Sequence, residues 1–306
     1  MRVVFMGTPD FAVPTLKKLI EDGFDIVSVF TQPDKPKGRG HKMQFSPVKE
    51  LALENNLEVF QPNTLKDESV INLIKEQNPE VIVVAAYGKI LPEAILNIPK
   101  YGCVNVHGSL LPKYRGAAPI QWAVLNGDKV TGVTTMLMGK GLDTGDMLLK
   151  REVEIPSDET SGELFDRLSL IGADLLVETL EALKSNTVTP QKQNDAESNY
   201  ASLITKALSP IDWSKSAAEI HNQVRGLNPW PCASSHYGEK AIKIHRTKVI
   251  EGSGEAGKLF VSDKHLCVYC GKDALQLLEV QLENGKRMTG DVFLVGHPVD
   301  KNSHFN

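Results

Sequence analysis

Long apolar runs, clustered cysteines and an excess of charge of either sign are all missing from this sequence. Its 306 residues contain no run approaching the ~18 apolar residues that cross a membrane. No basic segment followed by a long apolar one opens the chain, so we expect no secretory signal. The 41% hydrophobic and 24% charged residues are typical of a soluble cytoplasmic protein with enough length for two domains.

The four cysteines are too few and too scattered for a disulfide scaffold in a chain of this size. Cys267 and Cys270 have the spacing of a redox or zinc pair. Residues three apart in a strand face opposite sides, however, and no second pair completes a zinc site. We therefore expect both cysteines to be structural.

The net charge of −4 argues against a protein that binds nucleic acid with its whole surface. Residues 1–206 hold 22 basic and 27 acidic side chains, whereas residues 207–306 hold 12 and 11. Any contact with RNA is therefore expected from a local positive patch.

The first part of the chain alternates strand and helix patterns. Apolar runs at 2–6 and 25–31 flank a helix pattern, and the alternation continues to a long amphipathic helix that begins at a capping box, Thr160 to Glu163. This order predicts an α/β domain with a Rossmann-like parallel sheet over residues 1–185. The first turn lacks Gly-x-Gly-x-x-Gly, so a nicotinamide or flavin dinucleotide is not expected.

The second part of the chain has a different pattern. Residues 186–210 are polar and irregular and are interpreted as a linker along the surface. Residues 211–306 begin with a helix and continue with short strand-like runs, which predict a small barrel. The five expected strands are 240–250, 257–261, 266–269, 274–282 and 291–295.

Two polar side chains occur in the apolar run that begins at Cys103. Asn105 and His107 lie two residues apart, so in a strand they point to the same face. Gly108 follows at once, which places His107 at the carboxyl end of its strand, where open α/β sheets bind ligands. Taken alone, an Asn-x-His pair is more often a buried histidine and an asparagine with local hydrogen bonds.

The wider motif is more specific. The runs His107-Gly-Ser-Leu-Leu-Pro-Lys-Tyr-Arg-Gly-Ala-Ala-Pro-Ile-Gln-Trp122 and Gly141-Leu-Asp-Thr-Gly-Asp146 resemble the folate-dependent formyltransferases, and the similarity extends over nearly the full chain. This resemblance implies a Rossmann-like catalytic domain, a linker and an OB-like tRNA-binding domain over residues 211–306. It also implies transfer of a formyl group from 10-formyltetrahydrofolate to the amino group of methionyl initiator tRNA. We expect no metal, a monomer, and a location in the bacterial cytosol or an organelle of bacterial origin.

Formyl transfer by direct attack of an amine passes through a tetrahedral oxyanion, and no covalent enzyme intermediate is needed. Asn105 and His107 are expected to donate hydrogen bonds to that oxygen, which is worth on the order of 3 kcal/mol for each donor. Asp143 is expected to orient His107 and to help it carry protons. No Gly-x-Ser-x-Gly elbow surrounds Ser109, so a Ser-His hydrolase is not expected.

The resemblance also implies contacts with the folate. Residues after the strand at 81–86 border the pterin pocket in the family, and the loop after His107 lies beside the site. The expected folate-binding residues are Tyr87, Gly88, Ile90, Leu91, Ser109, Leu110, Leu111, Pro112 and Asp143.

A positive segment interrupts the acidic first part. Between Asp34 and Lys49 there are five basic residues and one acidic residue, with two glycines and two prolines, so we expect an irregular, mobile loop. Such a charge run is often only a solvated surface loop. Here it resembles the loop with which the family grips the acceptor arm of tRNA. The expected tRNA-binding residues are Lys35, Lys37, Arg39 and Lys42.

Other functions remain open at this point. Glycinamide ribonucleotide formyltransferase, amino-sugar nucleotide formyltransferase and the hydrolase-like domain of formyltetrahydrofolate dehydrogenase share the same core. The first would lack a second domain, the second usually has a fused decarboxylase, and the third has a long C-terminal extension. A protein of another class would be a non-catalytic RNA-binding protein with a relic Rossmann-like domain. The presence of Asn105, His107 and Asp143 together favours an enzyme over a relic.

Overall fold

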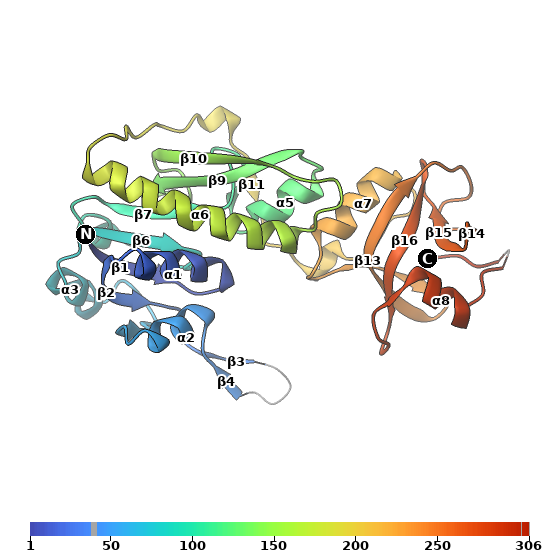
Figure 1. Ribbon diagram of the computed structural model, residues 1–306, viewed down its shortest axis with the longest axis horizontal. Coiled ribbons are helices and arrows are strands. Elements are labelled where there is room, and N and C mark those ends of the chain that lie inside the picture. The colour runs from blue at the N-terminus through green and yellow to red at the C-terminus, as the bar shows by residue number, and fades with distance from the viewer. Residues whose placement is uncertain (38–41, 301, 306) are drawn as a thin grey trace. The chain divides into compact units, whose positions relative to one another are not determined.

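The computed structural model describes residues 1–37, 42–300 and 302–305 and divides into two compact units (Figure 1). The first unit comprises residues 1–116, 131–153 and 165–201, and the second comprises 117–130, 154–164 and 202–306. The units alternate along the sequence because helix α5 (Pro119–Leu125) packs against α7 (Ala217–Gly226) of the second unit. Along the chain we retain 1–185, 186–210 and 211–306 as a proposed division.

The first unit contains a seven-stranded sheet in the order β10-β9-β7-β6-β1-β2-β5. Its strands are β1 (Arg2–Gly7), β2 (Asp25–Phe30), β5 (Val59–Phe60), β6 (Val81–Ala85), β7 (Cys103–His107), β9 (Val130–Leu137) and β10 (Met147–Glu154). The five strands from β5 to β7 pair in parallel, and β9 pairs antiparallel with β7. Every residue of β6 and β7 is buried, as expected for a sheet covered on both faces. The predicted Rossmann-like α/β core is thereby confirmed.

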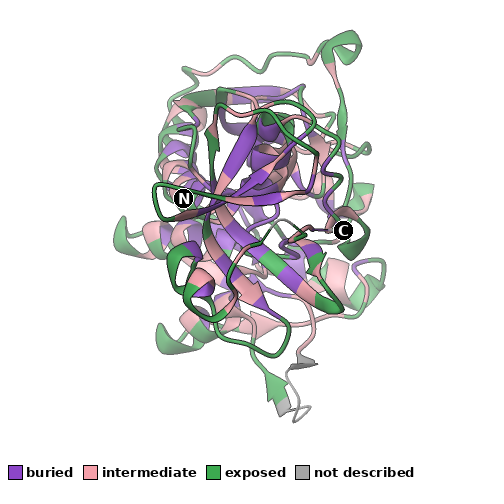
Figure 2. Ribbon diagram, turned by 90° about the vertical axis from the view of Figure 1, so that its right-hand side faces the viewer, coloured by how far each residue is buried: buried purple, intermediate pink, exposed green. Residues whose placement is uncertain are grey.

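Helices cover both faces of this sheet (Figures 1 and 2). They are α1 (Val13–Glu21), α2 (Pro47–Glu54), α3 (Glu68–Glu76), α4 (Glu93–Leu96) and α6 (Ser161–Lys184). The first unit also has 3-10 turns at Asp10–Ala12 and Asp195–Glu197, and the second unit has one at Lys206–Leu208. On β7, Val106 faces Gly172 of α6, whereas Cys103 packs with Ile74 and Ile95 of α3 and α4. Because side chains alternate along a strand, Asn105 and His107 share the face of Cys103.

The basic segment contains regular structure that we did not expect. Strands β3 (Lys35–Lys37) and β4 (Lys42–Gln44) pair antiparallel, with Pro36 opposite Met43. The prediction of an irregular segment was therefore wrong for these residues. A two-stranded ribbon consists only of edge strands, which tolerate a proline because one side needs no ladder hydrogen bond. Residues 38–41, which include Arg39, lie outside the described residues.

The second unit contains a six-stranded antiparallel sheet in the order β12-β13-β16-β15-β14, with β17 paired to β16. Its elements are α7, β12 (Ala233–Tyr237), β13 (Lys240–Ile250), β14 (Leu259–Ser262), β15 (His265–Tyr269), β16 (Ala274–Leu282), β17 (Met288–Thr289) and α8 (Gly290–Gly296). Four of the five expected strands are present. All four cysteines of the chain are free and buried.

The fifth expected strand, 291–295, is wrong, because these residues form α8. Thr289 caps that helix, since its hydroxyl accepts a hydrogen bond from Val292 N. The helix buries Phe293 completely and leaves Val295 85% exposed. A short apolar run does not distinguish a strand from a helix, and packing of Phe293 into the core decides the outcome here.

The C-terminal residues join the two edges of this sheet. Phe305 bridges Tyr237 of β12, and His304 bridges Lys258 immediately before β14. Phe305 is buried and stacks on Trp213, with 5.4 Å between ring centroids. One segment therefore contacts both edge strands, an arrangement compatible with the OB-like barrel that the resemblance implies. Within the described ranges, no helix is long and apolar enough to span a membrane.

The N-terminus of α6 has the predicted capping box. Thr160 N donates to Glu163 Oε2 at 2.9 Å, and Glu163 N donates back to the Thr160 hydroxyl. Arg246 of β13 also donates to Glu163 Oε1 at 2.5 Å. The Thr160 backbone and then the Arg246 guanidinium lower the pKa of Glu163 to about 2, although burial opposes the shift.

We expect the Glu163→Gln substitution to reduce the free energy of unfolding by about 1 kcal/mol at neutral pH, since the carboxylate is half-exposed and partly screened. A carboxyl group whose folded pKa is depressed stabilises the fold above its unfolded pKa of about 4.3. That contribution disappears as the pH falls towards 2. Chemical denaturation from pH 7 to 3 should show the wild-type advantage shrinking below pH 4.5.

Glu181→Gln provides the matched control. Glu181 is exposed on the same helix, and its carboxylate has no partner in the part of the chain that the structure describes. An equal loss in both variants, or a Glu163 difference independent of pH, would contradict the role of the capping box.

Candidate active site

The candidate site lies at the carboxyl end of β7. Asn105 and His107 are 8% and 6% exposed, so the strand holds both side chains in a largely buried position. The neighbouring strand β9 places Met136 opposite Asn105 and Thr134 opposite His107. The strand therefore fixes the direction of both side chains before any ligand binds.

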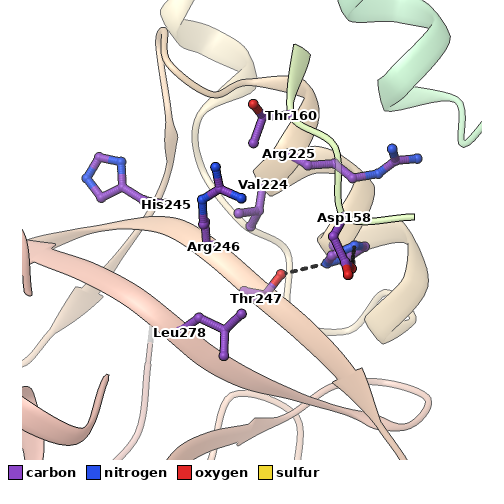
Figure 3. Close-up of a pocket in the computed structure, with 9 residues that line it drawn as sticks. Asp158, Thr160, Val224, Arg225, His245, Arg246, Thr247 and Leu278 are labelled. Carbon is purple, nitrogen blue, oxygen red and sulfur yellow. Dashed lines mark hydrogen bonds and ion pairs between the residues drawn. The ribbon is translucent and has the colours of Figure 1, made fainter. Parts of the chain in front are cut away.

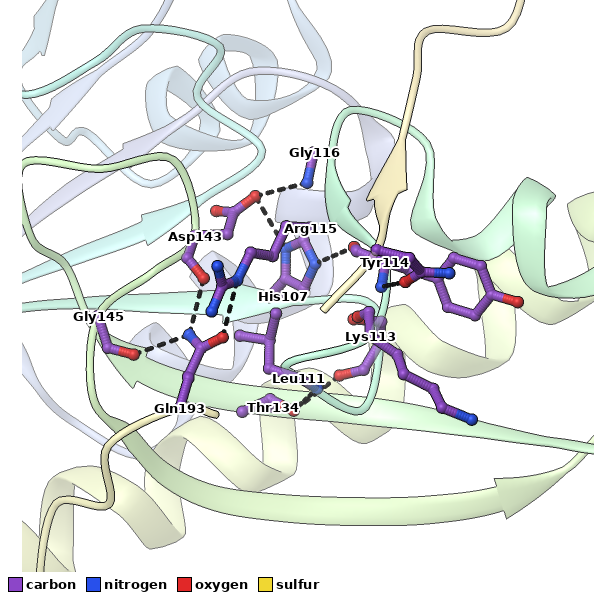
Figure 4. A network of polar contacts seen from close by, with 12 residues as sticks. His107, Leu111, Lys113, Tyr114, Arg115, Gly116, Thr134, Asp143, Gly145 and Gln193 are labelled. Carbon is purple, nitrogen blue, oxygen red and sulfur yellow. Dashed lines mark hydrogen bonds and ion pairs between the residues drawn. The ribbon is translucent and has the colours of Figure 1, made fainter. Parts of the chain in front are cut away.

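The imidazole of His107 is held from both sides (Figure 4). Its Nε2 atom lies 2.9 Å from the carbonyl oxygen of Tyr114. A carbonyl only accepts hydrogen bonds, so Nε2 carries a hydrogen and donates it. Its Nδ1 atom faces Asp143 Oδ2 at 3.8 Å, which is ion-pair distance but too long for a direct hydrogen bond. The structure thus brings together the predicted pair His107 and Asp143.

Asp143 is positioned by its own backbone and by a neighbouring loop. Its φ angle of 52° is in the left-handed region, in the turn between β9 and β10. Its Oδ2 atom accepts a hydrogen bond of 2.9 Å from Gly116 N. The carboxylate is therefore fixed between the His107 ring and the 114–116 segment.

The residues predicted to form a surface linker reach this site. Gln193 donates from Nε2 to the carbonyls of Asp143 and Gly145, at 2.7 and 2.8 Å (Figure 4). Strand β11 (Tyr200–Ala201) pairs with β8 (Arg115–Gly116). The polar composition of residues 186–210 is equally typical of a solvated linker, so it did not indicate these contacts. The run Gln193-Asn-Asp-Ala-Glu-Ser-Asn-Tyr-Ala201 resembles the folate-dependent formyltransferases as the two longer motifs do, and it was the signal that could have indicated these contacts.

Asn105 differs from its neighbours in having no partner. Its side chain makes no hydrogen bond with any residue that the structure describes, although it is only 8% exposed. The Asn105 amide is not among the fully buried side-chain atoms that lack a partner within the described residues, so it still reaches solvent and does not incur the cost of about 1–3 kcal/mol for a buried unpaired group. The Asn105 amide is therefore available to a ligand at the end of β7.

The expected folate-binding residues differ in accessibility. Tyr87 is 2% exposed, burial raises the pKa of its hydroxyl to about 12, and that hydroxyl has no hydrogen-bond partner among the described residues. Leu91 is also buried, whereas Gly88 is exposed and Ile90 is 75% exposed. Of this group, Gly88 and Ile90 have the most surface free to meet a ligand.

The loop after His107 is largely internal. The Ser109 hydroxyl donates to Lys113 O at 2.6 Å, and Leu111 packs against Met136. Pro112 is buried, and Leu110 is half-buried. These residues shape the loop, and their contact with folate stays a prediction.

The ends of the β3–β4 hairpin are anchored by one lysine. Lys49 Nζ lies 2.5 Å from Asp34 Oδ2, which precedes β3, and 4.0 Å from the centroid of the Phe45 ring, which follows β4. Burial opposes ionisation of Asp34, but its bonds with Lys49 and Gln61 outweigh burial and lower its pKa. Lys49 is thus neutralised internally, and the other lysines and arginine of this segment are the predicted Lys35, Lys37, Arg39 and Lys42, whose side chains the structure does not describe.

The second unit has a separate pocket of about 210 Å³ (Figure 3). Its lining residues are Asp158, Thr160, His221, Val224, Arg225, His245, Arg246, Thr247 and Leu278. Arg225 donates to the carbonyls of Pro156 and Glu159, and His221 contacts Ser157 O and the Thr247 hydroxyl. These two side chains therefore hold the segment before α6. Over the described ranges, no group of three His, Cys, Asp or Glu side chains is placed to bind a metal ion.

Comparisons with known proteins identify the family of the chain. A family model described as formyl transferase matches residues 1–180, and one described as formyl transferase, C-terminal domain, matches residues 203–298. Methionyl-tRNA formyltransferases from Caldanaerobacter subterraneus subsp. tengcongensis and Clostridium perfringens are 54% and 52% identical to this chain, each over 98% of both sequences. The crystal structure of WlaRD, a sugar 3N-formyl transferase in the presence of dTDP and 5-N-formyl-THF, has a similar fold, with a TM-score of 0.68, 19% identity and coverage of 90% of this chain and 97% of that one. This chain belongs to the formyl transferase family.

Proposed function

We propose that this enzyme transfers the formyl group of 10-formyltetrahydrofolate to the amino group of methionyl initiator tRNA. The observation that carries the catalytic assignment is the pairing of His107 with Asp143 beside the unpartnered amide of Asn105. The choice of acceptor rests on relatives that are more than 50% identical over nearly the whole chain and are named methionyl-tRNA formyltransferases.

The reaction begins when the free amine of the methionyl group attacks the formyl carbon. A carbon–nitrogen bond forms, and the carbonyl electrons move onto oxygen to give a tetrahedral oxyanion. Asn105 donates from its side-chain NH2 to that oxygen, because a donor held in a fixed position stabilises developing charge without reorganisation. The oxygen then reforms its double bond as the bond to N10 of the folate breaks.

Two protons move during this sequence. The attacking nitrogen loses one proton, and the departing folate nitrogen gains one. Since Nε2 of His107 is already bound to Tyr114 O, Nδ1 is the ring nitrogen left to take up or deliver a proton. Asp143 stabilises the imidazolium while Nδ1 holds that proton and keeps the ring in one orientation. Once Nδ1 has taken the proton from the attacking nitrogen, it serves as the second donor to the oxyanion and then passes that proton to the departing N10.

Recognition of a large RNA acceptor is assigned to the hairpin β3–β4 and to the second unit. The four cations at Lys35, Lys37, Arg39 and Lys42 are the local positive patch that an overall acidic protein needs. We assign the OB-like second unit to tRNA by family likeness. The enzyme acts as a monomer in the bacterial cytosol or an organelle of bacterial origin.

A transfer to a small amine, such as an amino-sugar nucleotide, is the alternative that the fold permits. A fold supports many substrates, so the similarity to a sugar formyl transferase at 19% identity carries no weight for the acceptor. Initial rates with methionyl initiator tRNA, elongator methionyl-tRNA, glycinamide ribonucleotide and an amino-sugar nucleotide decide between them. Preference for a small amine would overturn the tRNA assignment while leaving formyl transfer intact.

We expect Asn105→Ala and His107→Ala to lower kcat about 100- to 1,000-fold, because each removes a donor to the oxyanion. Single-turnover formylation of methionyl initiator tRNA measures the chemical step, and filter binding measures tRNA affinity, which should change less than about twofold. Asn72→Ala, at an exposed asparagine on α3, is the surface control. A chemical step that either substitution leaves at the wild-type rate would remove that residue from the mechanism.

We expect Arg39→Ala to weaken tRNA binding and to reduce the slope of log affinity against log salt by about 1, since one phosphate contact and its released counterion are lost. The chemical step at saturating tRNA should be unchanged. Lys75→Ala, at an exposed lysine on α3, is the matched loss of positive charge. Equal salt slopes for wild type and Arg39→Ala would show that this segment does not contact the RNA.

A further inference from the structure

We infer that Gln193 is a positioning residue for the His107–Asp143 pair, acting through a strap formed by residues 193–201. This inference rests on the catalytic assignment proposed above. The strap lies in the segment predicted to be a surface linker. In the structure it connects the two loops that contact the imidazole (Figure 4).

The strap is bonded first to the 114–116 segment. The side-chain oxygen of Asn199 accepts from Tyr114 N at 2.5 Å, and its backbone oxygen accepts from Arg115 N at 3.0 Å. The next residues form β11, which pairs with β8. These bonds fix the peptide whose carbonyl, that of Tyr114, receives the hydrogen from His107 Nε2.

The strap is bonded next to the loop that carries Asp143. The Gln193 amide nitrogen donates both of its hydrogens, one to Asp143 O and one to Gly145 O. Its side-chain oxygen accepts from Arg115 Nε at 2.9 Å, and Arg115 also donates to Asp195 Oδ1 at 2.7 Å. A single side chain therefore connects the turn at Asp143 with the segment at Arg115.

These bonds complete a closed ring of contacts. From Gln193 the ring passes through Arg115 and the Tyr114 carbonyl to His107, across to Asp143, and back to Gln193. The distance between His107 Nδ1 and the Asp143 carboxylate depends on two loops. The 114–116 segment binds the imidazole at Nε2, and the turn at Asp143 faces it at Nδ1. Removing the two donors of Gln193 takes two hydrogen bonds from the Asp143 turn, whose carboxylate then keeps the bond from Gly116 N, while His107 stays on its rigid strand.

Gln193 is distinguished from its neighbour Gln191 by these bonds. Gln191 pairs with Met147 through the backbone alone, and its exposed side chain has no hydrogen bond to any described residue. The two glutamines thus offer a matched comparison two positions apart. The side chain of Gln193 connects Arg115 with the Asp143 turn, whereas the side chain of Gln191 contacts neither.

The test compares Gln193→Met, Gln193→Glu and Gln191→Ala in single-turnover and steady-state formylation of methionyl initiator tRNA. We expect Gln193→Met to lower kcat about 10- to 100-fold, because small displacements of catalytic groups have effects of this size. KM for tRNA and for the folate should change less than about twofold. Gln191→Ala should retain wild-type kcat, and a kcat for Gln193→Met equal to that of Gln191→Ala overturns the inference.

Gln193→Glu separates the bond with Arg115 from the bonds with the Asp143 turn. It also tests the inference if the Gln193→Met variant does not fold. A carboxylate keeps the bond with Arg115 but has no hydrogens for the carbonyls of Asp143 and Gly145. We expect a loss of kcat as large as that of Gln193→Met. A wild-type kcat for Gln193→Glu would mean that Gln193 acts only by holding Arg115, which overturns the proposed route through Asp143.

A double-mutant cycle with Asp143→Asn tests the route directly. If Gln193 acts by positioning the Asp143 carboxylate, Gln193→Met should cost less than about threefold in the Asp143→Asn background. Full additivity of the two losses overturns the inference. A near wild-type kcat for both Asp143→Asn and His107→Ala would instead overturn the catalytic assignment itself, whatever the Gln193 variants do.

Discussion

The hydrogen bond from His107 Nε2 to the Tyr114 carbonyl is the constraint on which the candidate site depends. It fixes the tautomer of the ring and leaves Nδ1 as the nitrogen that faces Asp143. The Tyr114 carbonyl is in turn placed by the loop after β7. Thr134 of β9 donates to Ser109 O at 2.7 Å and accepts from Leu111 N at 3.0 Å. The antiparallel neighbour of β7 therefore secures the loop that orients the histidine.

This arrangement requires unfavourable backbone conformations in both loops. Tyr114 and Asp143 have φ angles of 58° and 52°, and a left-handed conformation costs about 1–2 kcal/mol for a residue with a side chain. The hydrogen bond that Tyr114 N donates to Asn199 and the one that Gln193 donates to Asp143 O oppose that cost. Gly116 is needed for another reason. Its φ is 113°, and a Cβ atom there would lie 2.7 Å from Ala201 O, so a side chain would disrupt the β8–β11 pairing.

The sequence predicted the fold correctly where a short-range pattern of residues determines the structure. Alternating strands and helices indicated the parallel sheet, and two-residue spacing placed Asn105 and His107 on one face. It was misleading at 291–295, because strand propensity does not reveal that Phe293 is buried in the core as part of a helix. The strap was interpreted as a linker because polar side chains form hydrogen bonds with water as readily as with other protein groups. Gln193 and Asp143 are 50 residues apart, and no local period connects them.

The polar character of the strap follows from the position of the loop that it holds. Asn105 and His107 come from a buried strand, so the core fixes them. Asp143 lies instead on a turn whose neighbour Leu142 is 51% exposed, and an apolar core cannot hold such a turn. Its backbone carbonyls are the groups that a neighbouring segment can bind, and they accept hydrogen bonds but donate none. A side-chain amide meets this need, because it gives two donors to the turn and keeps an acceptor for Arg115. The proposed site thus combines a histidine fixed by burial with a carboxylate fixed by polar contacts.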